Sequence, residues 1–90
     1  MDIRTGDYVT LKSVEEVKPL YEIWEYVKSS GSVATDTDYF TESMIDAMDS
    51  SDMYEVVEVT PDDVWIDVEG TVFGFEKKCI KDVYRLTKVS

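Results

Sequence analysis

The chain has 90 residues, of which 43% are hydrophobic and 32% are charged. The apolar residues fall in ordered patterns and suffice for one modest core, so we expect a single domain over residues 1–90 and not a disordered chain. One cysteine excludes an internal disulfide, and no apolar stretch approaches the roughly 20 residues of a membrane helix. Because Asp2, Arg4 and Asp7 also interrupt any signal-like run, the sequence predicts a soluble protein of the reducing cytoplasm.

The net charge of −11 is distributed unevenly. Residues 1–28 carry −2 and residues 77–90 carry +4, whereas residues 29–76 contain thirteen acids and no Lys or Arg. Such a block repels itself and opposes compact folding, so we expect it to serve something other than folding. Two interpretations stay open: the block binds a basic partner, or it only keeps the protein soluble.

The first elements are predicted to be a strand and a helix. Residues 7–12 alternate between polar and apolar and indicate a strand. Ser13 with Glu16 three residues later is a capping box, which opens a helix. Apolar residues at steps of three and four from Val14 to Val27 predict one helical face, and Pro19 either kinks this helix or splits it into two pieces.

The predicted helix ends near Ser30, because Gly31 supplies a stop. Residues 29–37 are polar and are predicted to form a mobile loop. Thr41 can cap a second, short helix that runs to about Asp49. Its inward residues are Met44, Ile45 and Met48, and its outer face carries Glu42, Asp46 and Asp49 at spacings of four and three.

From Met53 the hydrophobic period changes to two, which is typical of strands. The sequence predicts strands over residues 53–60, 64–69, 71–75 and 82–87, with a tight turn at 61–63, a turn at Gly70 and a one-turn connection over 76–80. In the second of these strands Val64, Ile66 and Val68 face one side, while Trp65, Asp67 and Glu69 face the other.

The same segments resemble a known family. Gly6–Lys12 reads GDYVTLK and is similar to the GDxVxLK opening of Src-homology-3-like (SH3-like) barrels. Residues 54–59, 64–68 and 73–75, with Ile80 before Val83, resemble the remaining strands of such barrels. Tyr39–Met44 resembles a helix that precedes the second strand in small uncharacterised bacteriophage proteins.

This resemblance implies an α+β, mainly β fold: a small five-stranded SH3-like barrel with a helical insertion, at about residues 13–52, between strands one and two. It implies no specific activity. The negative charge departs from that of nucleic-acid-binding barrels, so we expect no direct binding to nucleic acid.

Little in the sequence points to catalysis. The chain contains no His, which removes the commonest general base and the commonest zinc ligand. Cys79 has three lysines nearby that could activate its thiol, but a lone Cys among apolar neighbours is typical of a core. The acids from Asp36 onward do not match a calcium loop, because Phe40 and Thr41 occupy its fifth and sixth positions. We therefore expect no enzyme, no catalytic residue, no bound metal and no cofactor.

The acidic residues themselves are the remaining candidates for a functional role. Acids four apart on a helix face lie ~5–6 Å apart, and DNA presents one charge per ~1.7 Å of its axis. We therefore predict a phage-type, anti-defence inhibitor that imitates nucleic acid and binds the basic nucleic-acid-binding surface of a host protein. The predicted partner-binding residues are Asp36, Asp38, Glu42, Asp46, Asp49, Asp52, Trp65, Asp67 and Glu69.

The sequence leaves two points open, the function of the acidity and the role of Trp65. The chain could be a small structural or assembly subunit whose acidity serves solubility only. Trp65 could anchor a partner, since Trp is enriched in the anchors of binding interfaces, or it could be covered by a helix of the insertion. Trp24, on the apolar stripe of the first predicted helix, is expected to be a core residue.

Overall fold

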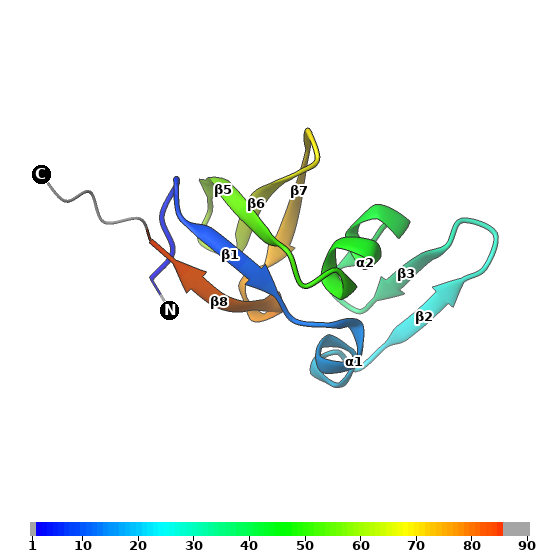
Figure 1. Cartoon of the computed structure of the whole chain (residues 1–90). Helices are drawn as coiled ribbons and strands as arrows, with labels where there is room; N and C mark the ends of the chain where they lie inside the picture. The colour runs from blue at the N-terminus through cyan, green and yellow to red at the C-terminus, as the bar shows by residue number, and fades with distance from the viewer. Residues whose placement is uncertain (1, 86–90) are drawn as a thin grey trace, which may run out of the picture.

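The computed structural model describes residues 2–85 (Figure 1). Of these, 45% lie in strands and 21% in helices, so the fold is small and mainly β. The elements in chain order are β1 (Tyr8–Leu11), α1 (Val14–Val17), the 3₁₀ helix η1 (Lys18–Leu20), β2 (Trp24–Val27), β3 (Ser32–Thr35), β4 (Tyr39–Phe40), α2 (Glu42–Asp49), β5 (Met53–Val59), β6 (Asp63–Val68), β7 (Thr71–Glu76), the 3₁₀ helix η2 (Lys77–Cys79) and β8 (Ile80–Tyr84). The strands form two antiparallel sheets, one of five strands and one of three.

The larger sheet has the strand order β7-β6-β5-β1-β8. The predicted first strand and the predicted three-strand meander are confirmed as β1 and β5–β7, and the one-turn connection is confirmed as η2. The last strand, β8, begins two residues before the predicted range of 82–87, and residues 86 and 87 lie outside the described part of the chain. Within residues 2–85 neither sheet closes on itself, because β7 and β8 stay at opposite ends of the larger one. A barrel is therefore not confirmed.

The insertion between β1 and β5 differs from the helical insertion predicted over residues 13–52. It begins as expected, since Ser13 and Glu16 form the capping box through both reciprocal hydrogen bonds. Helix α1 then ends at Val17, and Pro19 lies in the single 3₁₀ turn η1. Proline has no N–H to donate and its ring collides with the preceding turn, so the α-helix cannot continue. The insertion is thus mixed: α1 and η1, then the three-stranded sheet β2–β4, then α2.

The second half of the predicted long helix is a β-hairpin. Strand β2 pairs with β3 through all four of its residues. The spacing of three between Tyr21, Trp24 and Val27 indicates a helix, but a stretch so rich in aromatic and β-branched residues packs better on a pleated surface. Gly31 adopts a φ of +66° in the turn. The loop predicted over residues 29–37 is therefore also wrong, since this segment contains the hairpin turn and strand β3.

Helix α2 is confirmed where the sequence predicts it. The Thr41 side chain accepts a hydrogen bond from the Met44 amide at 3.3 Å, which caps the first turn, and Met44 and Met48 are buried. Figure 1 shows α2 between the five-stranded sheet and the arm formed by β2 and β3. The described chain is elongated, with principal extents of 51 × 24 × 20 Å.

A single cluster of buried apolar side chains connects the two sheets. Phe40 of β4 is fully buried in it. The centroid of its ring lies 5.7 Å from those of Tyr21 and Trp24, and 6.3 Å from that of Phe75 in β7. Trp24 is therefore partly buried against the core, as predicted, although it belongs to a strand and not to a helix.

Candidate functional site

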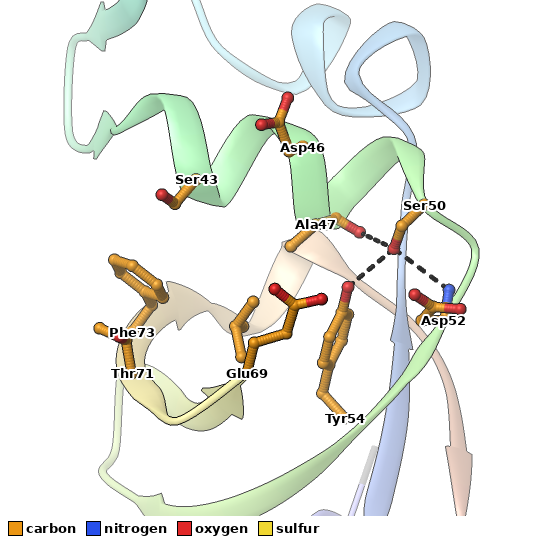
Figure 2. Close-up of a pocket in the computed structure, with 10 residues that line it drawn as sticks. Ser43, Asp46, Ala47, Ser50, Asp52, Tyr54, Glu69, Thr71 and Phe73 are labelled. Atoms are coloured by element: carbon orange, nitrogen blue, oxygen red, sulfur yellow. Dashed lines mark hydrogen bonds between the residues drawn. The ribbon is translucent and has the colours of Figure 1, made fainter.

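A pocket of about 310 Å³ lies between α2 and the turn that joins β6 to β7 (Figure 2). This volume is at the low end of the roughly 300–1,000 Å³ of small-ligand sites. The pocket has room for one long side chain and not for a folded segment. Its lining residues are Ser43, Asp46, Ala47, Ser50, Asp52, Tyr54, Val68, Glu69, Thr71 and Phe73.

The β6–β7 turn places Glu69 in this pocket. Glu69 and Gly70 both have positive φ angles, +50° and +91°, as the two central residues of a type I′ hairpin turn require. The Asp67 side chain accepts a hydrogen bond from the Gly70 amide at 2.8 Å and so holds the turn in place. Figure 2 shows Glu69 reaching from this turn toward α2, with Phe73 on one side and Tyr54 on the other.

A side-chain hydrogen bond connects the end of α2 to strand β5 at the pocket. It joins Ser50, just after α2, to Tyr54. Ser50 Oγ donates its proton to the Ala47 carbonyl at 2.8 Å. The 2.7 Å hydrogen bond between Ser50 Oγ and Tyr54 Oη must then use the proton of Tyr54, because a serine hydroxyl has only one. Tyr54 Oη can therefore only accept any further hydrogen bond.

Among residues 2–85, the three carboxylates of the pocket form no salt bridge. No Lys or Arg is among the described residues that line the pocket, and the four salt bridges of this part of the chain all lie elsewhere. Asp46, Asp52 and Glu69 are exposed, so they keep their hydration until a partner displaces it. A cationic group that enters this pocket would therefore contact no Lys or Arg among its described lining residues.

Three of the nine predicted partner-binding residues, Asp46, Asp52 and Glu69, line this pocket, and in Figure 2 the carboxylate of Asp46 points away from Glu69. Glu42 is exposed one helical turn before Asp46, where its carboxylate lies close to Gly31 in the β2–β3 turn. Asp49 is exposed as well, but its Oδ1 accepts a hydrogen bond from the Val14 amide at 3.1 Å. Asp49 therefore also connects α2 to the start of α1.

Trp65 and Asp67 lie on the opposite face of β6 from the pocket. Side chains alternate along a strand. Because Val68 lines the pocket, Trp65 and Asp67 must point to the other face of β6. Trp65 is half-buried and pairs with Gly74 of β7. A Cβ added to Gly74 would come within 2.9 Å of the indole ring, so the ring lies directly over this glycine. Packing across β7 accounts for the burial of Trp65.

Asp36 and Asp38 lie in the turn between β3 and β4, away from the pocket. Asp36 is exposed. Asp38 Oδ1 accepts a hydrogen bond from the Tyr39 amide at 2.8 Å, but Oδ2 is buried and has no hydrogen-bond partner in the described chain. Burial, together with the nearby charges of Glu76 and Asp63, raises the pKa of the Asp38 carboxyl. This oxygen faces the protein interior and is unsuited to meeting a partner.

Cys79 is fully buried, and its Sγ lies 3.5 Å from the Tyr21 hydroxyl. Burial raises the pKa of the Cys79 thiol to about 11, so it is protonated at neutral pH. Within residues 2–85, no three His, Cys, Asp or Glu side chains are grouped so that they could hold a metal ion. The helices in this part of the chain are also too short or too polar to cross a membrane.

No protein-family model, curated protein or solved structure matches this chain.

The pocket contains several residues that the sequence pattern does not single out as functional: Ser43, Ser50, Tyr54, Thr71 and Phe73. One signal was available for Tyr54. The alternation of β5 turns Tyr54 toward the core together with Val56, and an inward Tyr needs a hydrogen-bond partner for its hydroxyl. The other residues come together only because α2, which packs against β1, β3 and β4, lies across the pocket from the β6–β7 turn.

Proposed function

We propose that this protein is an acidic binding module. It engages a Lys/Arg-rich, nucleic-acid-binding surface of another protein through the face that carries α2, the pocket and the β6–β7 turn. It competes there with nucleic acid and acts as an inhibitor. The phage resemblance of the sequence makes a host defence enzyme the natural target.

The unpaired acids carry this proposal. Twelve acids lie between Asp36 and Glu69, and ten of them are exposed. None of the twelve forms a salt bridge within residues 2–85, where the anionic partners are Asp2, Asp7 and Glu76. Like charges that have no opposite partner raise the free energy of the folded state, and a basic partner that binds the acids beside α2 would relieve part of this cost.

The spacing of the charges supports the same proposal. Glu42 and Asp46 are one turn apart on α2, so their Cβ atoms are ~5–6 Å apart. A rigid helix that presents charges at this interval can occupy a groove lined by Lys and Arg, because such grooves bind phosphates largely through charge.

We also propose that the five-stranded sheet is an SH3-like barrel opened between β7 and β8. The strand order β7-β6-β5-β1-β8 and the one-turn η2 before the last strand support this finer assignment. The long connection between β1 and β5, which carries α2, would then be an enlarged first loop.

Competition with DNA tests the proposed function. Proteins of a bacterial lysate are first enriched on a DNA column, and this fraction is passed over the immobilised full chain at low salt. We expect specific proteins to be retained, and we expect them to be released both by added duplex DNA and by high salt, because exposed charges are screened within ~10 Å at 0.1 M. Retention that duplex DNA does not reverse would contradict the proposal.

A further inference from the structure

The described residues that line the pocket beside α2 offer hydrogen-bond acceptors and no side-chain cation. Three carboxylates line it, from Asp46, Asp52 and Glu69. The Tyr54 hydroxyl adds acceptor lone pairs, because its proton is used on Ser50. A ligand that complements this pocket must therefore be rich in donors, positively charged and small enough for about 310 Å³.

Four of the ten lining residues give part of the pocket wall an apolar and aromatic character. Phe73 and Tyr54 lie on either side of Glu69 in Figure 2, and Ala47 and Val68 complete the apolar lining. A flat cation can stack on an aromatic ring while it pairs with a carboxylate. The guanidinium of arginine does both, since it is planar, has five N–H donors and no acceptor, and is more weakly hydrated than an ammonium.

The carboxylates are too dispersed for a metal ion, since the described residues contain no group of three acids that could hold one. An elongated ligand is a better match. The stem of an arginine can follow the apolar wall while its head reaches Glu69.

We propose that this pocket receives one arginine side chain of a protein partner. The guanidinium pairs with Glu69, donates to Tyr54 Oη and stacks on an aromatic wall, and Asp46 and Asp52 add attraction at the rim. This inference rests on the proposed function, and it specifies the partner side chain that the acidic face selects.

The test uses blocked single amino acids as probes, observed by two-dimensional amide NMR of the full chain. The probes are N-acetyl-arginine methylamide, the lysine analogue, and the citrulline analogue, which has nearly the shape of arginine but no charge. We expect the arginine probe to shift the amides of Ser50, Glu69 and Thr71 in a saturable way. The lysine probe should bind several-fold more weakly, and the citrulline probe should cause no saturable shift.

Two matched variants locate the interaction. Glu69→Gln keeps the size of the side chain and removes one charge from the pocket, and we expect it to weaken arginine binding at least fivefold. Glu58→Gln removes the same charge from an exposed residue of β5 that pairs with Trp65. Glu58 lies on the face of the sheet away from the pocket, so this variant should leave binding unchanged. An unaltered amide spectrum outside the mutated site shows that each variant is folded.

The outcomes separate this inference from the proposed function. Equal effects of the two variants, equal binding of arginine and lysine, or a saturable citrulline shift would each overturn the arginine pocket. DNA-reversible capture of a partner could still occur in that case, and the proposed function would stand without the pocket. If capture fails but the arginine probe binds as expected, the pocket stands and the nucleic-acid-competing role fails.

Discussion

Replacing Phe40 with Ala should disrupt much of the packing between the two sheets. Phe40 is fully buried and its ring packs against Tyr21, Trp24 and Phe75. Truncation of a buried Phe typically costs ~3–5 kcal/mol, and the three lost aromatic contacts place this site at the upper end. A chain of this length has ~5–13 kcal/mol of total stability, so we expect at least about two fifths of it to be lost.

Urea denaturation measures this loss, and tryptophan fluorescence serves as the probe. Trp24 reports on the small sheet and Trp65 on the large one, so single-tryptophan variants (Trp24→Phe or Trp65→Phe) can be followed separately. We expect both probes to show one coincident transition, shifted to lower urea by Phe40→Ala. A loss below about 1 kcal/mol, or a shift seen by Trp24 alone, would refute the idea that Phe40 couples the sheets.

Three further predictions concern particular contacts. Asp38→Asn should stabilise the protein slightly at pH 7, because it removes the charge of a half-buried carboxyl, although the new amide NH₂ takes the unpaired position and cancels part of the gain. The pKa of Asp38 is raised by burial, so wild-type stability should recover as pH falls toward 4, and urea titrations of the two proteins should converge there. Gly74→Ala should cost ~1–3 kcal/mol, because the new Cβ collides with the indole of Trp65, and the cost should largely vanish in a Trp65→Val background. Hydrogen bonds from Arg85 lower the pKa of Asp7. The stability that the ionised Asp7 contributes is therefore present above about pH 4 and should be lost on further acidification. An Asp7→Asn variant should lack this acid-dependent loss.

The strands of the large sheet could be predicted because local and tertiary preferences agree there. Strands β5 to β7 alternate with a period of two, and Pro61 and Gly70 mark their turns. The β2–β3 hairpin could not be predicted in this way, since Tyr21, Trp24 and Val27 satisfy a helical spacing equally well. What decides in favour of the strand is pairing with β3 and burial against Phe40, and neither is visible in the local sequence.

The candidate site was only partly predictable for a similar reason. The absence of bases between residues 29 and 76 points to an acidic surface, but spacing alone cannot tell which acids face solvent freely. Asp49 and Asp67 have the same charge as Asp46 in the sequence, yet each accepts a hydrogen bond from a backbone amide. The pocket depends on the position of α2 over the β6–β7 turn, which follows from tertiary packing.

Charge reversal on the pocket-side face tests the central claim most directly. One variant changes Glu42, Asp46 and Asp52 to Lys, three exposed acids whose carboxylates take part in no salt bridge among residues 2–85. Its matched control changes the exposed acids Glu15, Glu22 and Glu25 to Lys, with the same change in net charge.

The measurement is the affinity of each variant for the partner captured in the DNA-release experiment, at two salt concentrations. Exposed ion pairs contribute ~0.2–1 kcal/mol each, and reversal replaces attraction with repulsion, so the first variant should bind at least about tenfold more weakly. The control should bind within about twofold of wild type, and the difference should shrink at high salt. If both variants lose the same affinity, or if neither does, the acidic face beside α2 is not the binding surface.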